Sequence, residues 1–386
     1  MSAVNKVSIC IVGPSKRFLS GISYYTIRLA NALSISCSVN VILLRRLLPE
    51  YLFPGRSHIG KSITHLEFSP DVHVFDGMDY NNPITWFRAY EYLNRIKPEF
   101  IILQWWTSSI SHIYLILKIM NLRSKSKLIM EFHEVVDPLE EKIFPIRLYS
   151  RVMGGILRKN ANGYIVHSSS DRFLVAKRYK IDPKKIHLIP HGLYDHYGKL
   201  MENKKAKHIL SLKEDYVILS IGLIRKYKGI TYLIKAFEQM PEKVIQRSRL
   251  LIVGEIWEER IDLFDQINSS KHKDKITLIE EYVPDNKISL YFSAANIVVL
   301  PYTRASQSGI AHIAMSFGKP VIVSEVGGLK ESMKSYEGTI FVPPENSSAL
   351  SNELINNFGC EKLYNPPALG WNIISEQYLK VLSGLI

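Results

Sequence analysis

Short apolar runs recur along the whole chain and alternate with segments whose apolar residues have helical spacing. Such runs are typical of strands buried on both faces of a parallel sheet, and the segments between them are typical of crossover helices. In the first half we predict helices at 22–33, 86–96 and 110–120, and strands at 7–12, 39–44, 100–103, 128–132, 163–167 and 186–189. This alternation predicts an α/β fold with a doubly wound parallel sheet.

The alternation starts again after a polar stretch, residues 194–207, that contains Gly198 and four lysines. This composition is typical of a linker. Beyond it we predict a helix at 230–237 and strands at 217–221, 250–253, 276–279, 297–300 and 320–324. Because 386 residues are too many for one ordinary core, we expect two α/β domains, 1–198 and 199–369. Ligands bind outside the carboxyl ends of such strands, so two facing domains would form a cleft there.

Composition favours a globular protein of a reducing compartment. The sequence is 46% hydrophobic and 22% charged, and its apolar runs are far shorter than the ~20 residues of a membrane-spanning helix. Its three cysteines are widely spaced and match no metal-binding pattern. Lys6 precedes only a short apolar run that ends at Gly13-Pro14, which indicates a first strand rather than a signal peptide. We therefore expect a cytoplasmic protein.

The net charge of +13 is concentrated in the first half of the chain. Residues 1–200 hold 27 Lys/Arg against 15 Asp/Glu, whereas residues 201–386 hold 22 against 21. An acidic partner is therefore expected to meet the first half, and nucleic acid and an anionic membrane surface are both compatible with that charge. Arg45 and Arg46 precede an apolar segment, 47–53, and this mixture fits a membrane-surface patch or a solvated loop.

Two turns between a strand and a helix carry the chemistry of an anion site. The first follows the strand 217–221 and contains Arg225, Lys226 and Lys228 ahead of the helix 230–237. The second follows the strand 297–300 and reads Ser-Gln-Ser-Gly, residues 306–309, ahead of the helix 310–317. Free N–H groups and the positive end of the helix dipole favour anions at both places. Together the two turns predict a two-sided clamp for a diphosphate.

The order of these motifs resembles glycosyltransferase family 4, whose members have the GT-B fold and take sugar from a nucleotide donor. The resemblance is carried in the second half by GLIRKYKG, LLIVGE, EYVPDNKI, VVLPY, SQSG and FGKPVIVSEVGGLKE. In the first half the segments GPSKRFLSGISYYTIRLANAL, FHEV and HSSSDR are similar to the family's glycine loop and first-domain motifs. A late aromatic segment, GWNIISEQYL, also fits, and it implies a C-terminal helix at about 370–386 that packs back on the first domain.

The resemblance implies a role for each matching residue. Arg225 and Lys228 would hold the donor diphosphate, and His133 would lie beside the donor sugar. The remaining donor-binding positions that it implies are Gly21 and Gly309 at the phosphates, Ser308 beside them, and Glu255, Tyr282 and Val283 near the nucleoside. Outside these positions we expect His191 to be structural and Trp105-Trp106 to be core, although a stacking platform for an acceptor is the alternative for the two tryptophans.

The sequence departs from the family pattern at two places. The family's pair of glutamates, seven residues apart, aligns with Ala305 and Ile313, so neither acid is present. The usual arginine after the glycine of the basic turn is Leu223, and Arg225 follows two residues later. These changes look like a variant of the family with IRxYKG and SQSG motifs. In that variant Gln307 would take over polar contacts to the sugar.

The resemblance implies transfer of a sugar from a UDP- or GDP-sugar to a glycan or lipid-linked acceptor, with retention of configuration. No Asp-x-Asp triplet occurs in the sequence, and we expect neither a metal nor another cofactor. A peripheral position on the inner face of the membrane would suit the basic first half. One alternative is an epimerase-like enzyme of the same fold, which the missing glutamates disfavour. Another is a non-enzymatic basic protein that binds nucleic acid, which the one-sided charge disfavours, so nucleic acid is not an expected partner.

Overall fold

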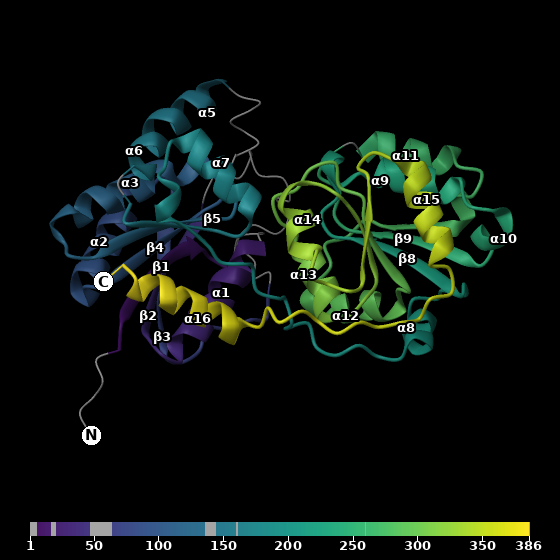
Figure 1. The fold of residues 1–386 in the computed structure, drawn as a ribbon, viewed down its shortest axis with the longest axis horizontal. Coiled ribbons are helices and arrows are strands. Elements are labelled where there is room, and N and C mark those ends of the chain that lie inside the picture. Colours follow the sequence, from purple (N-terminus) through teal and green to yellow (C-terminus); the bar gives the residue numbers. More distant parts are fainter. Residues whose placement is uncertain are drawn as a thin grey trace. The chain divides into compact units, whose positions relative to one another are not determined.

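The computed structural model describes residues 6–16, 21–46, 64–135, 144–159, 161–258 and 260–385. Internal contacts divide the chain into two compact units, the first comprising residues 1–192 and 369–386 and the second residues 193–368 (Figure 1). Each unit is built on its own parallel sheet. The chain therefore has two separate cores, as expected from its length.

The first unit contains a seven-stranded parallel sheet of order β3-β2-β1-β4-β5-β6-β7. Neighbouring strands pair in parallel throughout, so their carboxyl ends meet at one edge. The strands are β1 Ser8–Pro14, β2 Ser38–Arg46, β3 Val72–Asp79, β4 Phe100–Trp105, β5 Lys127–Phe132, β6 Gly163–Val166 and β7 Ile186–Leu188.

Apolar side chains cover both faces of this sheet. Along β1, Cys10 and Val12 belong to one core cluster and Ile9 and Ile11 to the other, because side chains of a strand alternate between faces. The helices of the unit are α1 Gly21–Ser34, α2 Pro83–Ile96, α3 Ser111–Met120, α5 Phe144–Tyr149, α6 Gly155–Arg158, α7 Ser169–Tyr179 and α16 Trp371–Ser383.

Helix α16 comes from the far end of the chain and completes the first unit. It lies beside α1 over one face of the sheet, as the yellow and purple ribbons of Figure 1 show. Its side chains Trp371, Ile374, Tyr378 and Leu382 are buried in the same core as Tyr25 of α1. The last segment of the chain is therefore part of the first core.

The second unit contains a six-stranded parallel sheet of order β10-β9-β8-β11-β12-β13. Its strands are β8 Tyr216–Ile221, β9 Ser248–Val253, β10 Ile276–Ile279, β11 Ile297–Leu300, β12 Val321–Ser324 and β13 Thr339–Val342. Its helices are α8 Asn203–Ile209, α9 Ile230–Glu238, α10 Glu242–Ile245, α11 Arg260–Ser269, α12 Asp285–Ala294, α13 Gly309–Ser316, α14 Gly327–Met333 and α15 Ser347–Asn356. The expected doubly wound α/β architecture is confirmed in both units.

The interpretation of residues 194–207 as a linker is wrong. Residues 203–209 form α8, which packs against α12, and the Asn203 amide donates to the carbonyls of Ser293 and Ala294 at 2.8 and 3.0 Å. Tyr194 and Tyr197 are buried. The lysines suggested a solvated segment, but the buried tyrosines that precede them anchor it. The division between the units accordingly falls at Gly192, ahead of the boundary expected at 198–199.

Two strands were absent from the sequence-based prediction. Strand β3 pairs with β2, and β13 pairs with β12, so both lie at sheet edges. Edge strands are buried less completely, and the exposed and half-exposed positions of β3 broke the apolar run that identified the other strands.

The paired tryptophans and the basic segment that begins at Arg45 were also singled out in the sequence. The tryptophans Trp105 and Trp106 are buried in the first core, as expected. The apolar part of the suggested membrane patch, 47–53, lies outside the described residues, and Arg45 pairs with Asp79 at 3.3 Å. Within the described ranges, no helix is long and apolar enough to cross a membrane.

Candidate active site

The sheet order of the second unit places the two turns that are predicted to bind anions next to each other. From β8 the chain winds to β9 and β10 on one side, and from β11 it winds to β12 and β13 on the other. Strands β8 and β11 are neighbours, so their carboxyl ends flank the point at which the winding direction changes. Open parallel sheets bind ligands at this point. The basic turn follows β8 and the Ser-Gln-Ser-Gly turn precedes α13 after β11.

The basic turn is in direct contact with the loop that leads from β11 to the Ser-Gln-Ser-Gly turn. The backbone N–H of Thr303 donates to the carbonyl of Tyr227 at 2.9 Å. The Lys228 Nζ lies 3.9 Å from the centre of the Tyr302 ring, and the Tyr302 hydroxyl lies 3.2 Å from the Ser308 Oγ. The ring of Tyr302 thus links Lys228 of one turn to Ser308 of the other. Burial raises the pKa of the Tyr302 hydroxyl, so the group stays neutral and polar.

Glycine makes this close approach possible. Gly229 caps the basic turn with a φ of +67°, and a Cβ built there would lie 1.9 Å from the Pro301 carbonyl oxygen after β11. Only glycine tolerates both the left-handed backbone and the contact. The close spacing of the two turns is therefore fixed by the backbone.

The amino terminus of α13 faces the same place. The Ser308 Oγ caps the helix by accepting from the Ala311 N–H at 3.4 Å, and Gly309 is the first helical residue. A Cβ on Gly309 would lie 2.8 Å from the Tyr194 ring, so the start of the helix is closely packed. The first N–H groups of a helix lack intrahelical partners and carry partial positive charge. This end of α13 suits a phosphate.

Two polar side chains of the turns have buried atoms without hydrogen-bond partners in the described part of the chain. They are Arg225, through its Nε, and Gln307, through both atoms of its amide. The Arg225 guanidinium stacks on Trp257, 4.5 Å from the ring centre. Buried polar groups are nearly always paired, so groups left unpaired at the ligand-binding edge of a sheet indicate a polar ligand.

The predicted nucleoside residues follow the next two strands of the sheet. The carbonyl of Glu255, after β9, accepts from the Ile224 N–H at 2.9 Å, which places it beside the basic turn. Tyr282 and the buried Val283 lie between β10 and α12. The carboxyl ends of β8, β9 and β10 thus carry the predicted phosphate and nucleoside positions in succession. Trp257, which the sequence analysis did not single out, lies in the same loop as Glu255.

Gly21 and His133 belong to the first unit. Gly21 begins α1, and His133 directly follows β5 with its backbone N–H donating to the Trp105 carbonyl at 2.8 Å. His191 is buried in this unit against Tyr25, with ring centres 4.6 Å apart, as a structural role requires.

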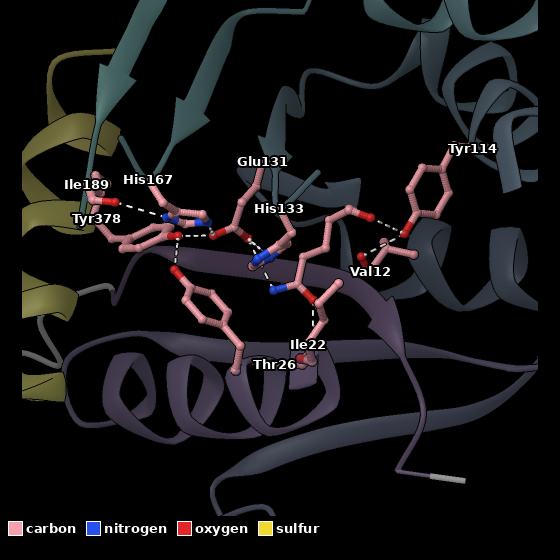
Figure 2. A network of polar contacts seen from close by, with 11 residues as sticks. Val12, Ile22, Thr26, Tyr114, Glu131, His133, His167, Ile189 and Tyr378 are labelled. Atoms are coloured by element: carbon pink, nitrogen blue, oxygen red, sulfur yellow. Dashed lines mark hydrogen bonds and ion pairs between the residues drawn. The ribbon is translucent and has the colours of Figure 1, made fainter. Parts of the chain in front are cut away.

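A buried polar network surrounds His133 (Figure 2). Glu131 and His133 are two residues apart at the end of β5, so both side chains lie on one face of the sheet. Glu131 accepts from the Gln104 Nε2 at 3.1 Å and from the Tyr378 hydroxyl of α16. His133 and His167 approach the two oxygens of Glu131 at 3.7 and 3.6 Å.

Of this network, only His133 was predicted from the sequence as a site residue. The alternation Glu-Phe-His at the end of the strand could have identified Glu131 as its neighbour on the same face. His167 follows β6, and its proximity depends on the pairing of β5 with β6.

Burial and the side chains of this network together set the protonation states of Glu131 and His167. Burial alone raises the pKa of Glu131, but the adjacent His133 and His167 and the hydrogen bond from Tyr378 lower it to about 2. Burial, helped by the charge of His133, lowers the pKa of His167 to about 4. At neutral pH the carboxylate is therefore ionised and His167 is uncharged.

Family models match both halves of the chain. The model described as Glycosyltransferase Family 4 matches residues 19–195, and the model described as Glycosyl transferases group 1 matches residues 201–365. An uncharacterized glycosyltransferase of Methanocaldococcus jannaschii is 29% identical over 138 residues, which are 36% of this chain and 34% of that protein. Mannosylfructose-phosphate synthase of Agrobacterium fabrum is 26% identical over 226 residues, 53% and 49% of the two chains. The chain thus spans half or less of the length of these relatives.

Solved structures are similar over nearly the whole chain. HepE from Anabaena, in complex with UDP, covers 98% of this chain and 100% of its own, with a TM-score of 0.69 at 18% identity. A glycosyltransferase from Rickettsia africae covers 99% of each chain, with a TM-score of 0.67 at 16% identity. The two consecutive family models and the two parallel-sheet units shared with these structures show that the chain belongs to glycosyltransferase family 4 and has the GT-B fold.

Proposed function

We propose that this protein transfers a sugar from a uridine diphosphate sugar to a glycan or lipid-linked acceptor, with retention of configuration. The observation that carries the proposal is the contact of the basic turn with the loop between β11 and α13, in which Tyr302 lies against Lys228 and beside Ser308 at the switch point of one sheet. The solved relative HepE is in complex with UDP in one structure and with UDP-glucose in another, which supports uridine as the donor base.

The chemistry proposed for the site is stabilisation of the leaving group. When the bond between the anomeric carbon and the diphosphate breaks, its electron pair leaves with the diphosphate, which gains negative charge. Arg225 and Lys228 supply positive charge there, and the N–H groups of α13 supply fixed dipoles. We propose that these groups act without a divalent cation on the diphosphate. His133 and Gln307 are the residues proposed to contact the donor sugar.

Binding of UDP tests the proposal. We expect UDP to raise the melting temperature of the wild-type protein more than GDP or ADP does, and added Mg²⁺ to leave the effect unchanged. A ligand at ~100 times its Kd stabilises the native state by roughly 2.7 kcal/mol. Arg225→Ala and Lys228→Ala should each reduce the stabilisation, and the double variant should abolish it.

Arg247→Ala is the matched control, because this exposed arginine precedes β9 at the opposite end of the strands and pairs with Asp215. It should keep the full response to UDP. Equal loss of the response in the control, or no response of the wild type to any of the three nucleotides, would overturn the proposed donor site.

The basic charge of the first half supports a position at the inner face of the membrane, with a lipid-linked acceptor. Flotation with liposomes that contain anionic lipid measures this directly. We expect binding that increases with the anionic fraction and weakens with added salt. Equal binding to neutral liposomes would remove this part of the proposal.

A further inference from the structure

We propose that Glu131, His133 and His167 form a binding site for a divalent metal ion with the ligand preferences of zinc. The site lies inside the first unit. Its ligand His133 is also proposed above to contact the donor sugar, whereas the proposed phosphate-binding residues belong to the second unit. In the described part of the chain, these three side chains place their ligand atoms within 4.8 Å of one another, and all three are buried. Two imidazole nitrogens and one carboxylate oxygen are a ligand set that zinc uses in proteins, with a fourth position open.

Neighbouring strands hold the three ligands in place. Glu131 lies on β5 and His133 directly follows it, while His167 directly follows β6. These strands are paired, with Phe132 opposite Val166, so the two histidines follow adjacent positions of one ladder. Figure 2 shows the carboxylate of Glu131 close to both imidazole rings. Ligands at strand ends are positioned more firmly than ligands on loops.

The distances within the cluster suit a shared ion. The Nε2 atoms of His133 and His167 lie 3.7 and 3.6 Å from the nearer carboxylate oxygens. These separations are too long for hydrogen bonds. Two ligands at zinc distances in a tetrahedral arrangement are about 3.3 Å apart. The two observed separations run to different oxygens of Glu131, and the three ligand atoms lie within 4.8 Å of one another, so the side chains would draw closer on metal binding. Both Nε2 atoms are buried and have no hydrogen-bond partner among the residues that the structure describes.

The surrounding hydrogen bonds orient the ligands as in known metal sites. The Nδ1 of His167 lies 2.9 Å from the Ile189 carbonyl, which can only accept, so Nδ1 carries the proton and the Nε2 lone pair faces the carboxylate. A lone pair that faces a carboxylate in a buried site is repulsive unless a cation or a hydrogen-bond donor lies between them. Gln104 and Tyr378 donate to Glu131 and leave lone pairs of both oxygens for a metal. Such outer partners are typical of metal-binding histidines and carboxylates.

A proton is the competing occupant. An imidazolium at His167 would also relieve the repulsion, and the cluster would then be a buried ion pair without a metal. The two explanations differ in metal content and in the protonation of His167, and both quantities can be measured on the full-length protein.

The first experiment measures metal binding to the tag-free protein. After removal of metal with a chelator and gel filtration, Co²⁺ is added and the visible absorption of tetrahedral Co²⁺ is recorded. Zinc uptake is measured in parallel by mass spectrometry. We expect one equivalent of either ion to bind to the wild type. Glu131→Gln and His167→Gln should lower the affinity at least tenfold.

The control is His73→Gln, which removes an exposed histidine of β3 and should bind metal like the wild type. A wild type that takes up no more zinc than the two ligand variants would overturn the proposal, and so would the absence of Co²⁺ absorption.

The second experiment needs no variant, so misfolding of a ligand variant does not affect it. Imidazole ¹⁵N spectra of the wild type with and without Zn²⁺ report the state of His167. We expect a neutral ring whose Nε2 resonance shifts on addition of Zn²⁺. If the ring carries protons on both nitrogens and its resonances do not shift on addition of Zn²⁺, the cluster is an ion pair and the proposal is overturned. The double variant Arg225→Ala/Lys228→Ala should lose the UDP response and keep the Co²⁺ spectrum, so the two sites can fail separately.

Discussion

At the scale of single residues, the second unit contains buried polar groups of two kinds. Glu214 is paired, because its Oε1 accepts from Arg249 at 2.6 Å and from Lys275 at 3.2 Å. The Gln307 amide has no such partners among the described residues, although both its polar atoms are buried. Paired groups support the fold, whereas unpaired groups cost stability unless a ligand satisfies them.

Gln307→Met should therefore separate stability from function. Methionine keeps the length of the side chain and removes both unpaired polar atoms, so we expect the ligand-free protein to gain about 1 kcal/mol. Transfer should fall, because the proposed contact to the donor sugar is lost. The measurements are urea unfolding without ligand and the initial rate of transfer. Loss of stability together with unchanged transfer would show that Gln307 is an ordinary packed residue.

The ion pairs of Glu214 predict a pH dependence of stability. Burial raises the pKa of Glu214, but the hydrogen bonds and charges of Arg249 and Lys275 lower it from 4.5 to about 2. A lowered folded-state pKa stabilises the protein above pH 4.5, and this contribution is lost as the pH falls toward 2. Glu214→Gln should remove at most about 3 kcal/mol at neutral pH and nothing near pH 2.

Urea unfolding at a series of pH values measures this difference. Asp215→Asn is the control, since the exposed carboxylate of Asp215 pairs with Arg247 in solvent and should contribute less than about 1 kcal/mol. A pH-independent difference between the wild type and Glu214→Gln would contradict the assigned ionisation.

At the scale of elements, the proposed donor site depends on how two βα connections pack. The basic turn and the loop after β11 touch through Gly229 and Pro301, and they share the hydrogen bond from Thr303 to Tyr227. Neither connection forms the site alone. The geometry of the site is therefore a property of the pair β8 and β11.

Gly229→Ala tests this dependence. The added Cβ would lie 1.9 Å from the Pro301 oxygen at a φ of +67°, so the turns must separate. We expect a loss of more than about 2 kcal/mol in the unfolding free energy and a weaker response to UDP. Gly359→Ala is the matched control, because Gly359 has a φ of +79° but open space around its Cβ position. It should cost about 1 kcal/mol and leave UDP binding intact. Equal effects of the two variants would contradict the contact.

At the scale of the whole molecule, each unit has its own sheet and core, but the chain enters the first unit twice. Helix α16 returns after the second unit and contributes Trp371 and Tyr378 to the first core. Tyr378 also donates to Glu131, so the end of the chain reaches the network around His133.

Trp371→Ala should destabilise the first unit selectively. The ring packs against Gly192, where a Cβ would lie 2.7 Å from it, and against Tyr25 at a centroid distance of 5.1 Å. Removal of a buried tryptophan costs about 3–5 kcal/mol. Calorimetry should show a lower melting transition for the first unit and an unchanged response to UDP. Phe173→Ala, at an exposed position of α7, should leave both unchanged. A single transition that shifts as a whole would show that the units unfold together.

Local sequence patterns were enough to predict the α/β class, most strands and the two turns of the proposed donor site. Central strands such as β8 and β11 are buried on both faces, so their apolar runs are visible without tertiary information. The basic and serine-rich turns were identifiable because charge and small polar residues at strand ends are local features. The edge strand β3 was missed because partial exposure removes that local signal.

Which of these local features meet depends on the packing of the folded chain. Glu131 and His167 are distant in the sequence, and only the pairing of β5 with β6 brings them together. Trp257 stacks on Arg225 because the loops that follow β8 and β9 are neighbours. Helix α8 packs against α12, which is distant from it in the sequence. Burial and helical spacing can be recognised from the residues of a single segment. Contacts between strand ends depend instead on strand order, which is settled by the packing of the complete sheet.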